Sequence, residues 1–293
     1  MLIDHVTIAG ASLEDLRGAY TQAGLAAHYG GAHSNGITHM DVMGFPDGTY
    51  LELISSLENA QADSPWWHSH IQSSGGPCAW AVRVNDLDSE VERLRSCGIF
   101  VDGPGDYHRA RPDGQRVEWR LAFPGEDPAG ATLPFLIEDR TPRELRVETT
   151  PEIAALAVDR DRPVGCVGVV KVVLGVTDLQ ESSELFQRAY GWSAPRIWHG
   201  RFAAFAGSPV ILAAPGSNSS STSRSLRERL NLFGPSPCGF LIGVEPELSA
   251  CQRFPVAIEP WLDLEVAWLE DGVFAAALGG WGKRALGFVE FGR

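Results

Sequence analysis

Short apolar segments, separated by turn residues, recur along the whole chain. Residues 2–9 (LIDHVTIA) have the apolar pattern of a β-strand. Residues 12–24 have the spacing of a helix, with Ser12 as the N-cap, acidic residues in the first turn and a closing glycine. Two further strands are predicted at 37–45 and 49–55, joined by a tight turn at Pro-Asp-Gly. With a short strand near LAAHYG, the predicted order is β-α-β-β-β.

A similar order recurs three times further along the chain. Residues 77–99 have the pattern of a strand, an acidic helix start and a closing glycine, and strands follow at 117–124 and 133–139. A third copy begins at residues 169–192 and continues in the hairpin FAAFAG and PVILAAP. The fourth copy is degraded: it opens at CGFLIGVEPELSAC, has a middle without a clear pattern, and ends at ALGFVEF. The openings HVTIAGASLEDL, AWAVRVNDLDSE and KVVLGVTDLQES support the repetition.

Internal repetition outweighs local signals when a fold is predicted. We therefore predict an α+β fold in which four βαβββ modules pair into two domains. The first domain covers residues 1–140, a charged and proline-flanked linker covers 141–163, and the second domain covers 164–293. The low-complexity segment GSNSSSTSRS, near 216–225, is predicted to be a flexible loop.

Composition narrows the class of protein. No apolar run approaches the ~18 residues of a membrane span, and the N-terminus lacks the pattern of a signal peptide, so a cytoplasmic protein is expected. The net charge is −13 and no basic run occurs, which argues against nucleic-acid binding. The five cysteines are scattered without CxxC spacing and are expected to be reduced thiols.

Two ionisable residues interrupt the apolar strands of the first module. His5 lies within the first strand, where hydrogen bonding to a backbone carbonyl is the structural alternative to a functional role. Glu52 lies between Leu51 and Leu53, so its carboxylate must either face solvent or be paired inside a cavity. No phosphate-binding loop, dinucleotide fingerprint, nucleophile elbow or HExxH motif occurs.

The segments DHVTIAG, GGAHSNG, DGTYLELI, WAVRVNDLDSEVERLRSCGI, VEWRLAFP and LPFLIED resemble the glyoxalase-like branch of the vicinal oxygen chelate superfamily. The resemblance covers roughly residues 1–140, is looser in the third module and looser still in the fourth. It implies that paired modules close into a cupped sheet, which binds a divalent metal and a small substrate. The family includes isomerases, extradiol dioxygenases, epimerases, epoxide-opening resistance enzymes and metal-free binding proteins, so the resemblance implies no single reaction.

The resemblance also implies where metal ligands would lie, on the first and last strands of each module. In the first module these positions hold His5 and Glu52, a donor pair suited to Fe(II), Mn(II), Zn(II) or Ni(II). His39 could supply a third ligand and serve beside Glu52 as a catalytic group. The register of the hairpin decides whether these two residues share a face.

The other modules depart from the family pattern at these positions. In the second module the first-strand position falls on Ala79, and the last-strand position falls on Phe135 or, with a shifted register, involves Glu138. In the third module Lys171 and Ile211 stand at or near the two positions. The C-terminal domain is therefore expected to lack a metal site of the usual kind.

Four further residues are candidates for substrate contact. His33 could touch a substrate anion, Arg120 could bind a carboxylate or phosphate, and Tyr50 and Trp80 could line the cup. The structural alternatives are a solvated loop for His33, a surface salt bridge for Arg120 and core packing for the two aromatic residues.

Two functions are compatible with these features. The first is a divalent-metal-dependent lyase, isomerase or dioxygenase acting on a small oxygenated molecule, with Glu52 or a neighbouring base moving a proton. The second is a metal-free protein that sequesters a hydrophobic or planar ligand. A small molecule is the expected partner in both cases, and a homodimer is possible.

Overall fold

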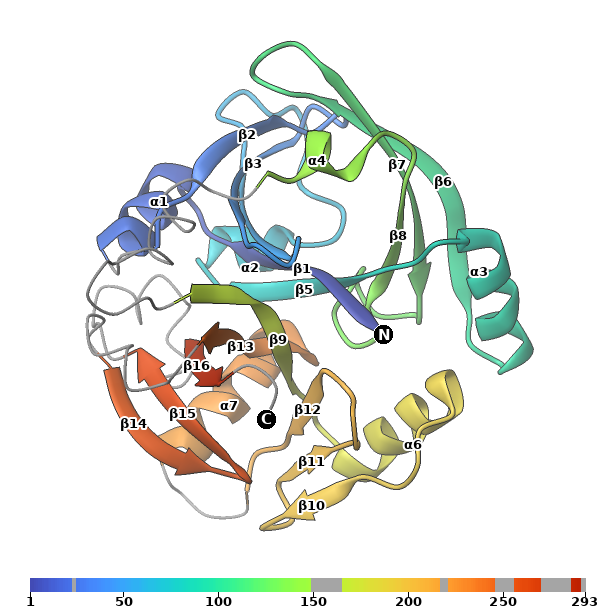
Figure 1. The fold of residues 1–293 in the computed structure, drawn as a ribbon, viewed down its shortest axis with the longest axis vertical. Coiled ribbons are helices and arrows are strands. Elements are labelled where there is room, and N and C mark those ends of the chain that lie inside the picture. Colours follow the sequence, from blue (N-terminus) through green and yellow to red (C-terminus); the bar gives the residue numbers. More distant parts are fainter. Residues whose placement is uncertain (23–24, 149–164, 217–220, 246–255, 270–285, 291–293) are drawn as a thin grey trace.

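The computed structural model describes residues 1–22, 25–148, 165–216, 221–245, 256–269 and 286–290. In this part of the chain the strands form two eight-stranded sheets, each curled into a barrel-like shape, that lie side by side (Figure 1). The strand order is β2-β3-β4-β1-β5-β8-β7-β6 in the first sheet and β10-β11-β12-β9-β13-β16-β15-β14 in the second. Adding eight to each strand number converts the first order into the second, so the second barrel repeats the first.

The first barrel contains the elements up to residue 146. Its strands are β1 (Leu2–Ala9), β2 (His28–Ala32), β3 (Thr38–Gly44), β4 (Tyr50–Ser56), β5 (Gly76–Arg83), β6 (Val101–Ala110), β7 (Arg116–Pro124) and β8 (Phe135–Asp139). Its helices are α1 (Leu13–Gln22), α2 (His68–Gln72), α3 (Leu87–Ser96) and α4 (Arg143–Arg146). The short helix α4 falls in the segment expected to be a linker, and it packs on the first barrel (Figure 1).

The second barrel has the same succession of strands. Its strands are β9 (Gly165–Gly175), β10 (Arg196–Trp198), β11 (Phe202–Ala204), β12 (Val210–Ala213), β13 (Ser236–Glu245), β14 (Val256–Trp261), β15 (Leu264–Leu269) and β16 (Leu286–Glu290). Its described helices are α6 (Leu179–Tyr190) and α7 (Ser221–Phe233). The α+β class and the paired βαβββ modules are confirmed. The fourth module, degraded in sequence, still supplies four strands in the order of the second module.

The helices begin where the sequence predicts caps. The Ser12 hydroxyl accepts a hydrogen bond from the backbone N–H of Asp15 at 3.1 Å. Asp86 accepts from Ser89 N–H before α3, and Asp178 accepts from two backbone N–H groups at the start of α6. Such caps satisfy donors that have no partner within the helix. They fix where each helix leaves its strand and crosses the outside of the sheet.

The two edge strands of the first sheet meet and close the barrel. An isolated antiparallel bridge joins His33, just after β2, to Arg109 in β6. The Arg109 guanidinium donates to the carbonyl of Gly30 at 2.6 Å and to that of Arg146 at 2.7 Å. Gly31, at φ +114°, allows the approach, because a Cβ there would lie 2.7 Å from the carbonyl oxygen of Ala110. The closure surrounds the inner face of the sheet.

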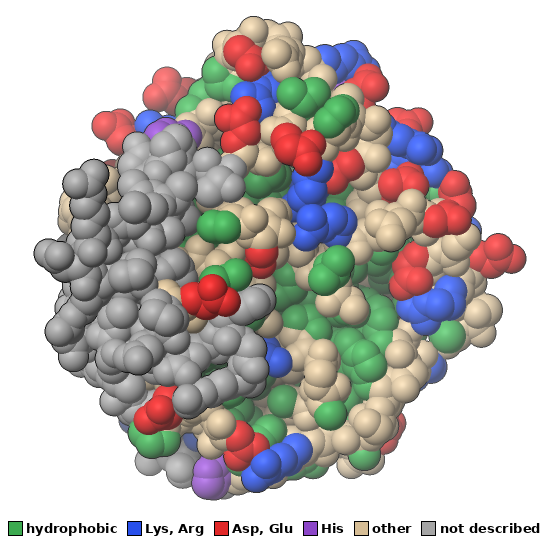
Figure 2. Space-filling view, viewed as in Figure 1, with side chains coloured by type: hydrophobic (Ala, Val, Ile, Leu, Met, Phe, Trp, Pro, Cys, Tyr) green, Lys and Arg blue, Asp and Glu red, His purple; other side chains and the backbone are tan. Residues whose placement is uncertain are grey.

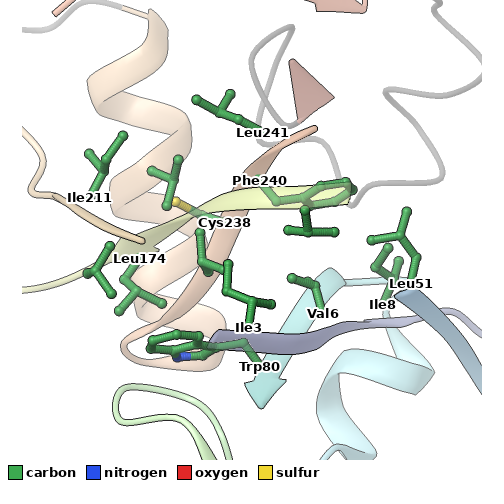
Figure 3. Close-up of a cluster of buried hydrophobic side chains, with 14 of the residues drawn as sticks. Ile3, Val6, Ile8, Leu51, Trp80, Leu174, Ile211, Cys238, Phe240 and Leu241 are labelled. Carbon is green, nitrogen blue, oxygen red and sulfur yellow. The ribbon is translucent and has the colours of Figure 1, made fainter. Parts of the chain in front are cut away.

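The two barrels share one hydrophobic core between them. Strands β1 and β5 of the first barrel pack against β9 and β13 of the second (Figure 1). Figure 3 shows Val6 and Trp80 from the first barrel with Leu174, Cys238 and Phe240 from the second, all of them buried. These are outer-face residues of their strands, so the inner face of the first barrel is left free.

A buried arginine adds polar contacts to this core. Arg229 of α7 donates to the carbonyl of Pro237 at 2.9 Å in its own barrel, and to the carbonyls of Gly75 and Pro77 in the first barrel. These bonds fasten α7 to the start of β5, next to α2.

The neighbouring His70 of α2 predicts a pH dependence of stability. Its ring stacks on Phe233, with centroids 4.2 Å apart, and burial together with the charge of Arg229 lowers the His70 pKa to about 3. An unfolded histidine has a pKa of ~6.5. The folded state therefore binds fewer protons below pH 6.5, and stability is lost as pH falls from 6.5 towards 3.

We expect His70 to contribute a loss of about 2 kcal/mol between pH 7 and pH 5, and a His70→Phe variant to lack that loss. Urea denaturation at the two pH values measures it. His68→Gln serves as the control, because the His68 side chain is 45% exposed. A pH dependence in the His70→Phe variant equal to that of the parent would contradict the assignment.

The charges on the surface, the helices and the cysteines can each be compared with what the composition predicts. Figure 2 shows Lys and Arg side chains interspersed with Asp and Glu on one face. Among the described helices, none is both long and apolar enough to cross a membrane. Cys78, Cys97 and Cys238 are free thiols, Cys166 is buried, and Cys251 lies outside the described residues.

Candidate functional site

A cavity of ≈ 370 Å³ lies inside the first barrel. Aromatic and aliphatic side chains form much of its wall. The ionisable residues that also line it are His5, His33, Glu52, Asp106, His108, Arg109 and Arg146. The lining residues used below are His5, His33, Tyr50, Glu52, Trp66, Trp67, Tyr107, Arg109, Trp119, Phe135 and Arg146. A concave, mostly apolar space with a few convergent polar groups is typical of a small-molecule site.

His5 and Glu52 meet in this cavity. Their strands β1 and β4 run parallel, with His5 opposite Tyr50 and Thr7 opposite Glu52. This register points both side chains to the inner face. The His5 Nε2 atom lies 3.6 Å from Glu52 Oε2, and the Thr7 hydroxyl donates to the same oxygen at 2.9 Å.

His33 joins this pair from the turn that follows β2. Its Nε2 atom lies 3.2 Å from the other carboxylate oxygen, Glu52 Oε1. Its Nδ1 atom lies 2.8 Å from the Thr38 hydroxyl, which holds the ring in place. Each oxygen of Glu52 thus faces a different imidazole.

The environment keeps Glu52 ionised. Burial opposes the charge, but hydrogen bonds from His33 and Thr7 and the proximity of His5 outweigh burial and lower the Glu52 pKa to about 2. The carboxylate is charged and almost entirely enclosed, so it attracts a cation, and both of its oxygens already contact partners inside the protein.

A charged network behind the cavity fixes the orientation of His5. The Nδ1 atom of His5 lies 2.8 Å from Asp4 Oδ1, and Asp4 is fully buried. Arg146 binds both oxygens of Asp4, at 3.1 and 2.9 Å, and Arg143 also contacts it. Burial raises the Asp4 pKa, but the charge of Arg146 and the contacts of His5 hold it well below its ordinary value. With Nδ1 occupied, the Nε2 atom of His5 is directed at Glu52.

Tyr50 completes this wall of the cavity. Its ring stacks on His5 with centroids 4.5 Å apart, and its hydroxyl accepts a hydrogen bond from Arg146 at 3.1 Å. Phe135 approaches the other side of His5, with centroids 5.2 Å apart. The imidazole is therefore held between two aromatic rings.

His39 does not reach the cavity, which corrects the expectation for it. In the antiparallel pairing of β3 with β4, Val42 lies opposite Glu52 and His39 lies opposite Ser55. Side chains alternate between faces along a strand, so His39 points to the face opposite Glu52. Its ring approaches that of Tyr29, with centroids 6.0 Å apart, on the outer side of the sheet.

Trp80 and Arg120 also lie outside the cavity. Trp80 is fully buried in the core between the barrels, where its indole N–H donates to the carbonyl of Thr132 at 3.0 Å. Arg120 faces helix α3 and forms a two-pronged ion pair with Asp88, with both contacts at 2.8 Å. The neighbouring Trp119 and Leu121 face inward instead. Trp80 thus packs in the core and Arg120 forms a salt bridge, as the structural alternatives for these two residues proposed.

The second module has apolar residues at its two ligand positions. Between the two modules, Thr7 of β1 lies opposite Ala79 of β5. Within the first module Thr7 pairs with Glu52, and within the second module Ala81 pairs with Phe135 in the same way. This register makes Ala79 the counterpart of His5 and Phe135 the counterpart of Glu52. Glu138 is displaced from that position and contacts Arg120 at 3.5 Å instead.

Only one of the four corresponding positions in the second barrel is ionisable. These positions hold Lys171, Ile211, Gly239 and Gly287. Ile211 pairs with Val173 as Glu52 pairs with Thr7, and the Lys171 amine donates to the carbonyl of Ser208 at 2.6 Å. In the fourth module the last-strand position is Gly287, where an added Cβ would lie 3.0 Å from Trp268. The side chains of Val266, Leu241 and Trp268 occupy the space next to Gly287.

Several residues of the site were not predicted from the sequence. They are the buried charges Asp4 and Arg146 and the wall residues Trp66, Trp67, Tyr107 and Trp119. Asp4 could have been predicted from the sequence, because it is a second ionisable residue in an apolar strand and stands next to His5. The others depend on how distant strands meet.

Comparison with known proteins agrees with the observed fold. The family model described as a glyoxalase-like domain matches residues 3–193. No curated protein matches the chain. A hypothetical protein from Staphylococcus aureus is similar in structure, with 13% identity and a TM-score of 0.62 over 99% of both chains.

Two enzymes also have similar structures. A mutant of 4-hydroxymandelate synthase from Streptomyces coelicolor has 12% identity and a TM-score of 0.59, over 99% of this chain and 92% of that one. The Mn(II)-bound glyoxalase from Novosphingobium aromaticivorans has 9% identity and a TM-score of 0.53, over 99% of this chain and 81% of that one. At these identities the likeness shows the fold alone. The matched family model, which spans more than half of the sequence, shows that the chain belongs to the glyoxalase-like domain family.

Proposed function

We propose that this protein is a divalent-metal-dependent enzyme, a lyase, isomerase or dioxygenase, that acts on a small oxygenated molecule within the first barrel. The observation that carries the proposal is the convergence of His5 Nε2 and the ionised Glu52 carboxylate in an enclosed cavity. One of the similar structures is a glyoxalase bound to Mn(II), an ion that accepts such donors.

The residues present fit a divalent ion in their chemistry. Among the described residues, no three or more His, Cys, Asp or Glu side chains stand in the arrangement of a formed metal centre, and Glu52 is bonded to His33 and Thr7 instead. The support comes from His5, whose Nδ1 atom contacts the buried Asp4 carboxylate. A metal-binding histidine typically has such a partner on its other nitrogen.

His5 and Glu52 would hold the ion, which when bound would act as a Lewis acid towards vicinal oxygens of the substrate. Glu52 or a neighbouring base would move a proton of the substrate. Trp66, Trp67 and Tyr107 line the cavity and would exclude water from the reacting centre.

The surrounding charges favour an anionic substrate. Arg143 and Arg146 contact the carboxylates of Asp4 and Asp139, and Arg109 donates to two backbone carbonyls. Together with Glu52 these charges balance, and Asp106, which also lines the cavity, adds one negative charge. A bound divalent ion would add two positive charges in a largely enclosed space. Electrostatic attraction would then favour a ligand with enolate, phenolate or carboxylate oxygens, while the aromatic walls favour a planar apolar body.

Metal content tests the proposal. We expect untagged protein supplied with Fe(II), Mn(II), Zn(II) or Ni(II) to retain about one ion per chain, and His5→Ala and Glu52→Ala each to lose it. Mass spectrometry of the metal after dialysis measures the content. Glu58→Ala, which removes an exposed carboxylate at the end of the same hairpin, is the matched control. Retention of no ion by the parent under any of these conditions would reject the metal-dependent enzyme.

The second module supports one alternative function. Ala79 and Phe135 replace two ligand positions with apolar groups, which favours a metal-free protein that sequesters a planar ligand. This alternative predicts ligand binding that weakens in Trp66→Ala and persists in His5→Ala, as measured by quenching of tryptophan fluorescence.

A further inference from the structure

We propose that the second barrel shapes the cavity of the first barrel through helix α2, with Phe233 and Arg229 as positioning residues for the tryptophans of the cavity wall. The described residues that line the cavity all lie between His5 and Arg146, so the second barrel acts on it from outside. The consequence for ligand binding rests on the proposed function, which places the ligand in this cavity. The coupling itself rests on contacts between the barrels.

The connecting helices of the two barrels meet at their interface. Helix α2 lies between β4 and β5 of the first barrel, and α7 lies between β12 and β13 of the second. These are the same places in the repeated strand order. The two helices contact each other, and so do the strands β5 and β13 that follow them. Each barrel thus places its connecting helix against that of the other.

Helix α7 holds α2 at His70. The His70 ring stacks on Phe233, the last residue of α7, with centroids 4.2 Å apart and an interplanar angle of 21°. The Nε2 atom of His70 is buried and has no hydrogen-bond partner among the described residues, so the ring is held by packing at that side. A Cβ at Gly75 would lie 2.9 Å from the Phe233 ring and 3.0 Å from that of His70. The turn after α2 therefore closes tightly over the stacked pair.

Arg229 fixes the backbone that follows α2. Its guanidinium donates to the carbonyls of Gly75 and Pro77, and it also lies 5.2 Å from the centroid of the Phe233 ring. Phe233 therefore contacts both a cation of its own helix and the imidazole of α2. One cluster of the second barrel thus holds α2 and the chain that leaves it.

The segment that α7 holds also carries two tryptophans of the cavity wall. Trp66 and Trp67 directly precede α2, and both line the cavity. The Ile71 N–H donates to the carbonyl of Trp67 at 2.9 Å, so the first turn of α2 begins at Trp67. The Trp67 indole N–H donates to the carbonyl of Ala129 at 3.2 Å, and the Trp66 ring packs on Phe123 with centroids 4.8 Å apart. A shift of α2 would therefore displace both indoles.

Helix α2 depends on contacts with both barrels. It has five residues, too few to keep a helical shape without tertiary packing. Ile71, which is 1% exposed, packs α2 on the first barrel, and His70 packs it on α7. Loss of the second contact would leave a short segment fixed on one side only. The position of the tryptophan wall is therefore set jointly by the two barrels.

Fluorine NMR of protein labelled with 5-fluorotryptophan tests this coupling without any ligand. Trp66→Phe and Trp67→Phe assign the two resonances. We expect both resonances to shift in Phe233→Ala and in Arg229→Met, because the indoles then change their surroundings. His70→Phe keeps a ring stacked on Phe233, so both resonances should stay where they are in the parent.

Leu226→Ala is the matched control for a loss of stability alone. Leu226 lies in the same helix and is 1% exposed, but it packs on its own barrel, where a Cβ at Gly175 would lie 3.0 Å from it. We expect this variant to lose stability to urea at least as much as Phe233→Ala does, while both resonances keep the parent positions. Circular dichroism shows that each variant is folded, and Phe233→Leu decides the outcome if Phe233→Ala does not fold.

Catechol, a planar molecule with two vicinal oxygens, is the probe for ligand binding. We expect Phe233→Ala to bind catechol at least about 5-fold more weakly than the parent, as measured by quenching of tryptophan fluorescence, and Leu226→Ala to bind it as the parent does. Resonances of Trp66 and Trp67 that keep the parent positions in Phe233→Ala would overturn the inference. Resonances that shift, in a protein whose parent binds neither catechol nor a metal, would uphold the coupling and reject the proposed function instead.

Discussion

Replacing Trp80 with alanine is expected to lower the free energy of unfolding by about 3–5 kcal/mol. The side chain is fully buried between the two barrels, among residues such as Val6 and Leu174 (Figure 3). The substitution removes this packing and also leaves the carbonyl of Thr132 without its indole N–H donor. Urea denaturation followed by circular dichroism measures the loss.

A second tryptophan separates stability from ligand binding. Trp66 lines the cavity and is partly exposed, so Trp66→Ala should cost clearly less stability than Trp80→Ala. Ligand and metal binding by folded Trp80→Ala protein should match the parent, because Trp80 faces away from the cavity. A Trp80→Ala protein that is as stable as the parent but no longer binds the ligand would contradict this placement. It would instead support the prediction from the sequence that Trp80 lines the cup.

The fold could be predicted from the sequence because its signals are local and repeated. Caps at Ser12 and Asp178 and alternating strands such as 49–55 are visible in one module and recur in the next. Strand β6 escaped prediction, since Gly103, Pro104 and Gly105 weaken its pattern. An edge strand tolerates such residues, because one side of its backbone needs no sheet partner.

The site could be predicted only in part, because face and register are not local properties. His39 and Glu52 both lie in apolar strands, but a shift of one residue in their pairing decides whether they share a face. Trp80 is adjacent to Ala79, and only the alternation along β5 separates the core from the inner face. His33 gave a weak signal because a histidine in a glycine-rich turn is usually solvated.

Arg146 illustrates a feature that sequence patterns could not reveal. It falls in the segment expected to be a linker, yet it is buried and bonds to Asp4, Asp139 and the Tyr50 hydroxyl. A charged residue in a charged segment gives no sign that the chain folds back over a barrel. Asp4 lies 142 residues from Arg146 in the sequence, and Asp139 lies 7 residues from it.

Replacing Arg146 with methionine is expected to lower the free energy of unfolding by about 3–5 kcal/mol, because it leaves the buried carboxylate of Asp4 with too little positive charge. Arg143 and His5 remain in contact with Asp4, but Arg146 alone binds both of its oxygens. Arg140→Met is the matched control. Arg140 is half exposed and lies 3.6 Å from Glu138, so its removal should cost at most about 1 kcal/mol.

A double variant decides whether charge is the cause. Adding Asp4→Asn to Arg146→Met should restore part of the lost stability, because the second change removes the uncompensated carboxylate that the first one leaves. If the Arg146→Met variant is instead destabilised by lost side-chain packing, the double variant would show no recovery. The losses of stability from the two substitutions would then add. Mn(II) affinity should fall about 10-fold in Arg146→Met, since Asp4 then holds His5 less firmly. An Arg146→Met protein that matches Arg140→Met in both stability and Mn(II) affinity would show that the buried network neither stabilises the barrel nor orients His5.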